Sequence, residues 1–280
     1  MTPSFAVYLI NLDQDRDRLA HMQGQLAAAG LEFMRVPAID GRRLPAKWAA
    51  RFPPAPKGLR PLKPGEAGCF ASHLDVMERF LETDAAAALV LEDDLVVPAA
   101  IRSLMTECLT KLPAGFDIVR LSNPAKRAFI TVAEFSGDSL IIRYSVMPRN
   151  TGAYLLSRAG AAKFLKSAQG VRPVDEEMRR PWLTGLDTFG VMPAPILSNI
   201  FESTIDTFGD RGLFHKPMIR LFLGQGDGLA DRYQMARSAI ETLGAHAWTR
   251  CLGRNLLHKV TPRLPLDAPV SAVNKRWRIR

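Results

Sequence analysis

Three consecutive acidic residues, Glu92, Asp93 and Asp94, interrupt a strongly apolar run at residues 87–97. Such a run is typical of a buried parallel strand, whose carboxyl end opens on the edge where α/β proteins bind ligands. Neighbouring carboxylates repel each other, and burial increases the repulsion unless a cation neutralises them. Because hard divalent cations such as Mn²⁺ and Mg²⁺ prefer carboxylate oxygens, the segment predicts a metal site at a sheet edge.

A second interpretation of these acidic residues stays open. Pro98 suits the first turn of a helix. Acidic side chains just before a helix are stabilised by the positive end of its dipole. In that case the cluster would begin a helix and bind no metal.

The surrounding sequence indicates alternating strands and helices that would position these carboxylates. Residues 5–12 are apolar, residues 16–30 have helical spacing and end in glycine, and residues 32–37 form a second strand. Together they predict a right-handed βαβ unit. Further helices are expected at 66–83, 98–112, 157–168 and 229–243, and further strands at 87–97, 116–121, 151–156 and 194–198. A hairpin is expected from 128–132 and 139–144. The remaining segments are a long loop at 42–64 and a mixed segment at 174–190.

Length and charge predict an α/β domain with a basic appendage. The chain has 280 residues and a net charge of +9. Residues 213–280 contain 12 Lys and Arg but 4 Asp and Glu. We therefore expect a single α/β domain at 1–212 and a helical, basic appendage at 213–280. The 3 cysteines are scattered and form neither a zinc-type pair nor a disulfide framework, which favours a cytoplasmic location.

Three blocks of sequence together point to a known family. They are VYLINL at 7–12 with RDR at 16–18, GEAGCFASH at 65–73 followed by LVLEDD at 89–94, and TGAYLLS at 151–157 with PVD at 173–175. In this order and spacing they resemble glycosyltransferase family 25, which includes bacterial lipopolysaccharide and lipooligosaccharide galactosyltransferases and collagen galactosyltransferases. The resemblance covers about residues 5–205. It implies a GT-A fold, a nucleotide-sugar donor such as UDP-galactose, and an inverting transfer.

The resemblance also assigns roles to the acidic cluster. Its residues stand where GT-A enzymes carry an Asp-x-Asp signature, so Asp94 is expected to be the main metal ligand and Glu92 to lie near the metal or the ribose. Asp93 would point the opposite way if the chain is still extended. It is expected to contact the donor or to shape the strand end.

Five further residues are candidates for the donor site. Asn11, Arg16 and Asp40 follow the first two strands, at the mouth of the predicted crevice. Asn11 and Asp40 are expected to hold uracil or ribose, and Arg16 to face a phosphate; alternatively they belong to a helix start and a turn. Ser72 and His73 lie in the second block and are expected near the donor, or in hydrogen bonds that order the loop before them.

An inverting transfer needs a base beside the acceptor hydroxyl. Asp175 matches the acidic position of the third block, so the resemblance implies Asp175 as the general base. Asp187 is the alternative.

The basic appendage predicts an anionic partner. Residues 248–260 interleave basic and apolar side chains, as interfacial amphipathic helices do. We expect contact with an anionic membrane surface on its cytoplasmic side, while a phosphorylated acceptor or a solvated appendage remain alternatives. No nucleic-acid recognition motif accompanies the charge.

The sequence thus predicts an inverting, metal-dependent transferase that moves a hexose onto a glycolipid or oligosaccharide acceptor, such as lipopolysaccharide. One alternative is an inactive nucleotide-sugar-binding protein of the same pathway. Another is a nucleotidyltransferase, although a glycine-rich phosphate loop is missing near the first strand.

Overall fold

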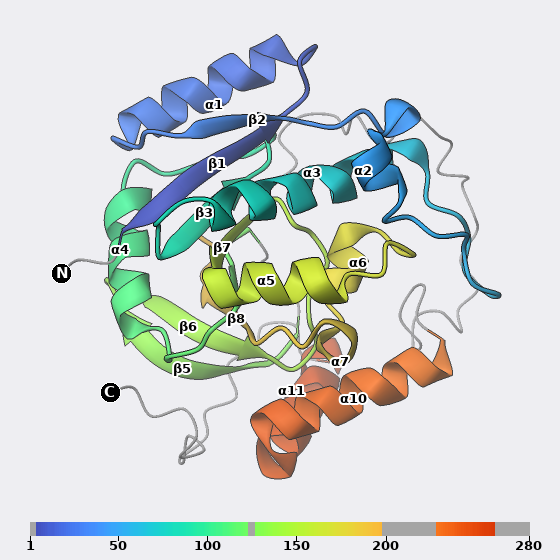
Figure 1. Ribbon diagram of the computed structural model, residues 1–280. Helices are drawn as coiled ribbons and strands as arrows, with labels where there is room; N and C mark the ends of the chain where they lie inside the picture. The colour runs from blue at the N-terminus through green and yellow to red at the C-terminus, as the bar shows by residue number, and fades with distance from the viewer. Residues whose placement is uncertain (1–3, 123–126, 198–227, 261–280) are drawn as a thin grey trace.

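A computed structural model describes residues 4–122, 127–197 and 228–260, with side chains up to His258. Its centre is one eight-stranded sheet of order β2-β1-β3-β7-β4-β8-β6-β5 (Figure 1). The strands are β1 (Phe5–Asn11), β2 (Met34–Pro37), β3 (Ala87–Leu91), β4 (Ile118–Arg120), β5 (Phe129–Phe135), β6 (Ser139–Tyr144), β7 (Ala153–Ser157) and β8 (Thr188–Met192). The helices are α1 (Arg16–Ala28), α2 (Ala46–Ala49), α3 (Pro64–Leu81), α4 (Ile101–Lys111), α5 (Arg158–Ser167), α6 (Val174–Met178), α7 (Pro181–Thr184), α10 (Leu229–Leu243) and α11 (Ala245–Val260), with a 3-10 turn, η1 (Gly41–Arg43).

The N-terminal part of the sheet is the predicted parallel βαβ unit, extended by the strand β3. β1 pairs in parallel with β2 on one side and with β3 on the other. In the second pairing Leu9 lies opposite Leu91, so the two strands end at nearly the same level of the sheet. Residues that follow β1 and β3 are therefore brought to one edge.

The rest of the sheet is mixed. β7 lies antiparallel between β3 and β4, and β4 pairs in parallel with β8. The predicted hairpin is present as β5 and β6 at the far edge. Its turn places Ser136 and Gly137 at positive φ, which glycine adopts at no steric cost.

Helices cover both faces of the sheet, because alternate side chains of each strand point to opposite sides. On one face Leu89 and Leu91 pack with Met22 of α1 and Met105 of α4. On the other face the neighbouring strand residues pack against α3 and α5, which lie side by side across the sheet in Figure 1. The acidic cluster thus follows a strand that is buried on both faces.

The C-terminal helices α10 and α11 pack against α7 and β5, respectively (Figure 1). Asn255 of α11 accepts a hydrogen bond from the amide of Ala128 at 2.6 Å, and Asp231 of α10 pairs with Arg180 at 3.1 Å. α10 has the bounds expected from sequence. The domain boundary expected between residues 212 and 213 lies outside the described residues. Among the helices described, none is long and apolar enough to cross a bilayer.

Two expected strands are corrected. The strand predicted at 87–97 ends at Leu91, so all three carboxylates lie in the segment that follows it. The final strand is β8 and not 194–198, where the described residues make a single bridge between Leu197 and Val96. β8 was hidden because Gly190 interrupts its apolar pattern. A Cβ at Gly190 would lie 2.0 Å from the hydroxyl of Tyr144, so the strand needs glycine there.

Candidate active site

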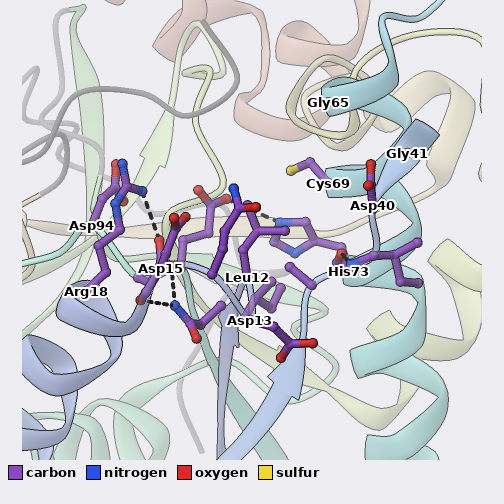
Figure 2. Close-up of a pocket in the computed structure, with 18 of the residues that line it drawn as sticks. Leu12, Asp13, Asp15, Arg18, Asp40, Gly41, Gly65, Cys69, His73 and Asp94 are labelled. Atoms are coloured by element: carbon purple, nitrogen blue, oxygen red, sulfur yellow. Dashed lines mark hydrogen bonds and ion pairs between the residues drawn. The ribbon is translucent and has the colours of Figure 1, made fainter. Parts of the chain in front are cut away.

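A cavity of about 340 Å³ opens at the carboxyl ends of β1, β2 and β3 (Figure 2). Its volume suits a small-molecule ligand. Its walls are the loop after β1, the η1 turn, the start of α3 and the segment after β3. The polar residues that line it are Asn11, Asp13, Gln14, Asp15, Arg18, Asp40, Arg42, Cys69, Ser72, His73, Glu92, Asp93 and Asp94.

The parallel pairing of β1 and β3 explains why these side chains meet. Asn11 is the last residue of β1, and Glu92 follows the last residue of β3. The amide of Asn11 donates to Asp93 at 2.7 Å, across 82 positions of sequence. Of the ten site residues expected from sequence, seven line this cavity together.

Asp93 is held by protein partners on both oxygens. Asn11 donates to one oxygen, and the guanidinium of Arg18 donates to the other at 3.1 Å. Burial raises the pKa of Asp93, and these two partners oppose the rise. Asn11 is anchored in turn, since it also donates to the carbonyl of Asp15 at 3.0 Å and accepts from Arg35 at 3.0 Å. Asp93 therefore fixes the strand end, and its expected contact with the donor remains a prediction.

Glu92 lines the cavity and is held by α3 and by the segment just before β7. His73 Nε2 lies 3.2 Å from a carboxylate oxygen of Glu92, and the hydroxyl of Thr151 donates to the same oxygen at 2.9 Å. His73 Nδ1 lies 2.8 Å from the hydroxyl of Tyr154. Burial alone would raise the pKa of Glu92, but the hydrogen bonds from His73 and Thr151 lower it below its ordinary value. Glu92 is thus kept as a carboxylate that faces the cavity.

Asp94 is the carboxylate that the protein leaves unsatisfied. Its Oδ1 is buried and has no hydrogen-bond partner. Burial and the charges of Glu92 and Asp93 raise the pKa of Asp94 to about 6. A buried acceptor without a partner is costly, so such a group indicates a missing cation or donor.

Two glycines let the η1 turn press against α3. A Cβ on Gly41 would lie 1.7 Å from the carbonyl oxygen of Pro64, and one on Gly68 would lie 2.3 Å from that of Ile39. Ser72 fastens the same contact, since its hydroxyl accepts from the amide of Ile39 at 2.8 Å and donates to the carbonyl of Gly68 at 2.7 Å. This buried hydroxyl fixes the segment after β2 against α3, and the expected contact of Ser72 with the donor remains a prediction.

The remaining donor candidates are divided by the structure. Asp40 lines the cavity and pairs with Arg42 at 2.8 Å, which lowers the pKa of Asp40 to about 2. Arg16 is absent from the cavity lining, whereas Arg18 is part of it (Figure 2). Arg18 belongs to the first sequence block and is one of the residues that the sequence reasoning missed.

The two candidate bases lie in different surroundings. Burial and the neighbouring Glu176 raise the pKa of Asp175, while Arg120 and the amide of Asn150 oppose the rise. Asp187 is instead committed to an ion pair with Arg143, a side chain that is 3% exposed. Both lie outside the residues that line the cavity described above. Of the two carboxylates, Asp187 forms an ion pair with Arg143, whereas no ion pair of Asp175 is found among the described residues.

Cys69, Thr151 and Tyr154 were also missed as members of the site. Cys69 and His73 are four residues apart on α3 and so share a face, a spacing visible in the second block. Thr151 and Tyr154 stand in the third block, but their contact with Glu92 and His73 depends on the antiparallel pairing of β3 and β7. No local signal in the sequence gives that pairing.

Comparison with known proteins agrees with this architecture. The sequence model of "Glycosyltransferase family 25 (LPS biosynthesis protein)" matches residues 5–178. A "Glycosyltransferase 25 family member" of Aedes aegypti is 29% identical over 182 residues, which are 61% of this chain and 30% of that protein. One from Anopheles gambiae is 36% identical over 96 residues, or 32% of this chain and 16% of that protein.

A galactosyltransferase is among the relatives. "Procollagen galactosyltransferase 2" of Mus musculus is 33% identical over 96 residues, which are 32% of this chain and 15% of that protein. The matched segments thus span less than a third of the curated relatives' length. The family match covers β1 to α6, including every strand that borders the cavity, and the fold is of the GT-A-like, Rossmann type. The chain therefore belongs to glycosyltransferase family 25.

Proposed function

We propose that this protein is an inverting glycosyltransferase that moves a hexose from a nucleotide-sugar donor, galactose from UDP-galactose, onto a glycan acceptor. The observation that carries the proposal is the unpartnered, buried Oδ1 of Asp94 in a cavity at the ends of parallel strands. The family membership and the galactosyltransferase among the relatives support it.

A divalent cation fits the acidic residues of this cavity. Asp94 has a buried oxygen without a hydrogen-bond partner, and Glu92, two residues earlier, is held as a carboxylate. Asp94 and Glu92 would hold Mn²⁺ or Mg²⁺, which favour carboxylate ligands. When bound, such a cation neutralises charge on a diphosphate and makes it a better leaving group.

The donor would occupy the cavity with its diphosphate toward the acidic segment. Arg18 is the cationic side chain nearest Asp93 and would add positive charge there. Asp40, after β2, and Asn11, at the end of β1, line the cavity and would contact the ribose or uracil. This assignment keeps Asn11 in its network, where its carbonyl oxygen already accepts from Arg35.

The transfer itself would use Asp175 as the base. The acceptor hydroxyl oxygen forms a bond to the anomeric carbon as the bond from that carbon to the diphosphate oxygen breaks. UDP leaves with the bonding electron pair, and the hydroxyl proton passes to Asp175. A raised pKa suits a base that must hold a proton during the transfer.

The acceptor is proposed to be lipopolysaccharide or a related oligosaccharide at the cytoplasmic side of the membrane. The description of the matching family supports the acceptor class. α11 exposes Leu252, Leu256 and Leu257 while Cys251 is buried, so this helix presents apolar side chains outward. Together with the basic charge after residue 212, that surface suits an anionic membrane. Sedimentation of the protein with anionic vesicles and with neutral vesicles tests the membrane contact separately from the transferase activity.

The test of activity uses the full chain, Mn²⁺ and a panel of nucleotide sugars. Thermal shifts identify the donor, because a ligand that binds only the folded state raises its stability. Release of UDP, with and without an oligosaccharide acceptor, then measures hydrolysis and transfer. Donor binding without turnover would favour an inactive binding protein and refute the proposed activity.

Two variants separate the proposed roles. Asp175→Asn should retain donor binding and lose transfer, whereas Asp138→Asn, in the exposed turn of the hairpin, should keep both. Unchanged turnover of Asp175→Asn would remove Asp175 as the base.

A further inference from the structure

Among the described residues one group of side chains has the donor atoms of a zinc site. The sulfur of Cys69, a ring nitrogen of His73 and a carboxylate oxygen of Glu92 all lie within 4.8 Å of one another. Cys69 and His73 lie on the wall of the cavity that α3 forms (Figure 2). Thiolate, imidazole and carboxylate are the three ligand types that proteins use for Zn²⁺.

Secondary structure places all three ligands. Cys69 and His73 project from one face of α3, and Glu92 follows β3 directly beneath that helix. Cys69 is partly exposed and Glu92 is 28% exposed, so a cation in the cavity reaches both. The ring of His73 is buried, and its Nε2 already lies 3.2 Å from the carboxylate.

The surroundings of the group orient it for metal binding. A metal-bound histidine donates its other ring N–H to an oxygen, which fixes its tautomer. His73 Nδ1 lies 2.8 Å from the hydroxyl oxygen of Tyr154 and can donate to it. Thr151 donates to Glu92 at 2.9 Å and so orients the carboxylate.

We propose that Cys69, His73 and Glu92 form a binding site for a thiophilic divalent cation, Zn²⁺ being the example. This site differs from the proposed site of Asp94 and Glu92 in using Cys69 and His73, and the two sites share Glu92. A fourth position remains for water from the cavity.

To bind one cation, the ligand atoms of Cys69, His73 and Glu92 must move slightly closer together. Tetrahedral Zn²⁺ with bonds of about 2.0–2.3 Å separates its ligand atoms by about 3.3–3.6 Å. The pair of His73 and Glu92 is already that close, and the sulfur of Cys69 lies within 4.8 Å of both, so it needs to approach by no more than about 1.5 Å, within the reach of one side-chain rotation. Binding releases the thiol proton of Cys69 to solvent. His73 would bind through Nε2, so the ring proton that Glu92 accepts in the metal-free protein must move to Nδ1, where the hydroxyl oxygen of Tyr154 accepts it.

The charge around Cys69 favours a cation. Burial raises the pKa of the Cys69 thiol, and the nearby carboxylates of Glu92, Asp175, Glu66 and Asp94 raise it further. The same negative field attracts a divalent cation, which would compensate for the proton lost. A site with sulfur and nitrogen ligands should also prefer Zn²⁺ to Mn²⁺.

Occupancy would inhibit sugar transfer. Zn²⁺ on Glu92 removes a ligand from the cation of the donor and fills the floor of the cavity. This consequence alone rests on the proposed function. We therefore expect micromolar-to-millimolar Zn²⁺ to inhibit even with Mn²⁺ in excess.

The test measures metal binding without donor or acceptor, so its failure is separate from failure of the proposed activity. Co²⁺ is added to the full-length protein as a coloured substitute for Zn²⁺. We expect near-ultraviolet thiolate-to-cobalt absorption that Zn²⁺ removes by displacement. Cys69→Ser should abolish the absorption and weaken Zn²⁺ binding at least tenfold, whereas Cys108→Ala, in the core on the other face of the sheet, should leave both unchanged.

A second measurement needs no variant. Zn²⁺ should protect Cys69 from an alkylating reagent, as read by mass spectrometry of its peptide, while the buried Cys108 and Cys251 stay unlabelled in either state. Absence of thiolate absorption in the wild type, equal absorption in Cys69→Ser, or labelling of Cys69 at alkaline pH that Zn²⁺ does not reduce would each overturn the proposal.

Discussion

Replacing Asp94 with asparagine should make the protein more stable while it removes the metal dependence. The native fold raises the pKa of Asp94 from 3.8 to about 6, chiefly by burial and then by the charges of Glu92 and Asp93. A shift of about two units at about 1.4 kcal/mol each would give about 3 kcal/mol. Because Asp94 is only partly buried, solvent screening reduces this to about 1–2 kcal/mol.

The sign of the effect sets its pH dependence. Asp94 is an acid whose folded-state pKa lies above the unfolded value, so ionisation disfavours the native state. The penalty is absent well below pH 3.8, grows between pH 4 and pH 6, and is complete above pH 6. The stability gained by Asp94→Asn should therefore be small at pH 4 and reach its full value at pH 7.

Chemical denaturation at several pH values measures this difference directly. Asp138→Asn is the matched control, since the same substitution at an exposed turn should change stability by less than about 0.5 kcal/mol. Addition of Mn²⁺ at a hundred times its dissociation constant should stabilise the wild type by about 2.7 kcal/mol and leave Asp94→Asn unchanged. A destabilised Asp94→Asn at pH 7, or a gain that does not vary with pH, would refute the account of this carboxylate.

Three further outcomes are expected. Gly68→Ala should cost about 2–3 kcal/mol and weaken donor binding, because its Cβ would lie 2.3 Å from the carbonyl of Ile39; Gly24→Ala, with no atom within 4 Å, should be neutral or stabilising in the same denaturation assay. Mn²⁺ affinity measured by calorimetry should fall about tenfold per pH unit below pH 6, as Asp94 takes up a proton, and a flat profile would contradict this. Asp231→Asn should cost about 1–2 kcal/mol by removing the ion pair of α10 with the body, and hydrogen exchange should rise in α10 first.

The N-terminal βαβ unit could be predicted because its signals are local. Continuous apolar runs predicted β1 and β3, and Gly30, which adopts a positive φ just after α1, predicted the end of that helix. The helix expected at 157–168 is present as α5, and the hydroxyl of Ser157 caps it by accepting a hydrogen bond from the amide of Gly160 at 3.0 Å. Each of these features depends on residues within one element or its first turn, so the sequence alone contains them.

β8 and the exposed face of α11 depended on distant neighbours. Gly190 lowers the strand signal of β8, yet the side chain of Tyr144 on the next strand requires it. Residues 248–260 were interpreted as an interfacial amphipathic helix, and in the structure Cys251 is buried whereas Leu252, Leu256 and Leu257 are exposed. Which side of an amphipathic helix is covered depends on the surface that it meets.

For the site, the residue types alone give the chemistry that is available: three carboxylates after a buried strand, and a block that holds Cys69 and His73. The differences between the carboxylates depend on contacts made in the folded protein. Asn11 and Arg18 bind Asp93, His73 and Thr151 bind Glu92, and Asp94 keeps an unsatisfied oxygen. Adjacent acids have the same intrinsic chemistry, so their roles are set by partners from β1, α1, α3 and the segment just before β7. Those partners are brought together by sheet pairing between segments far apart in the chain.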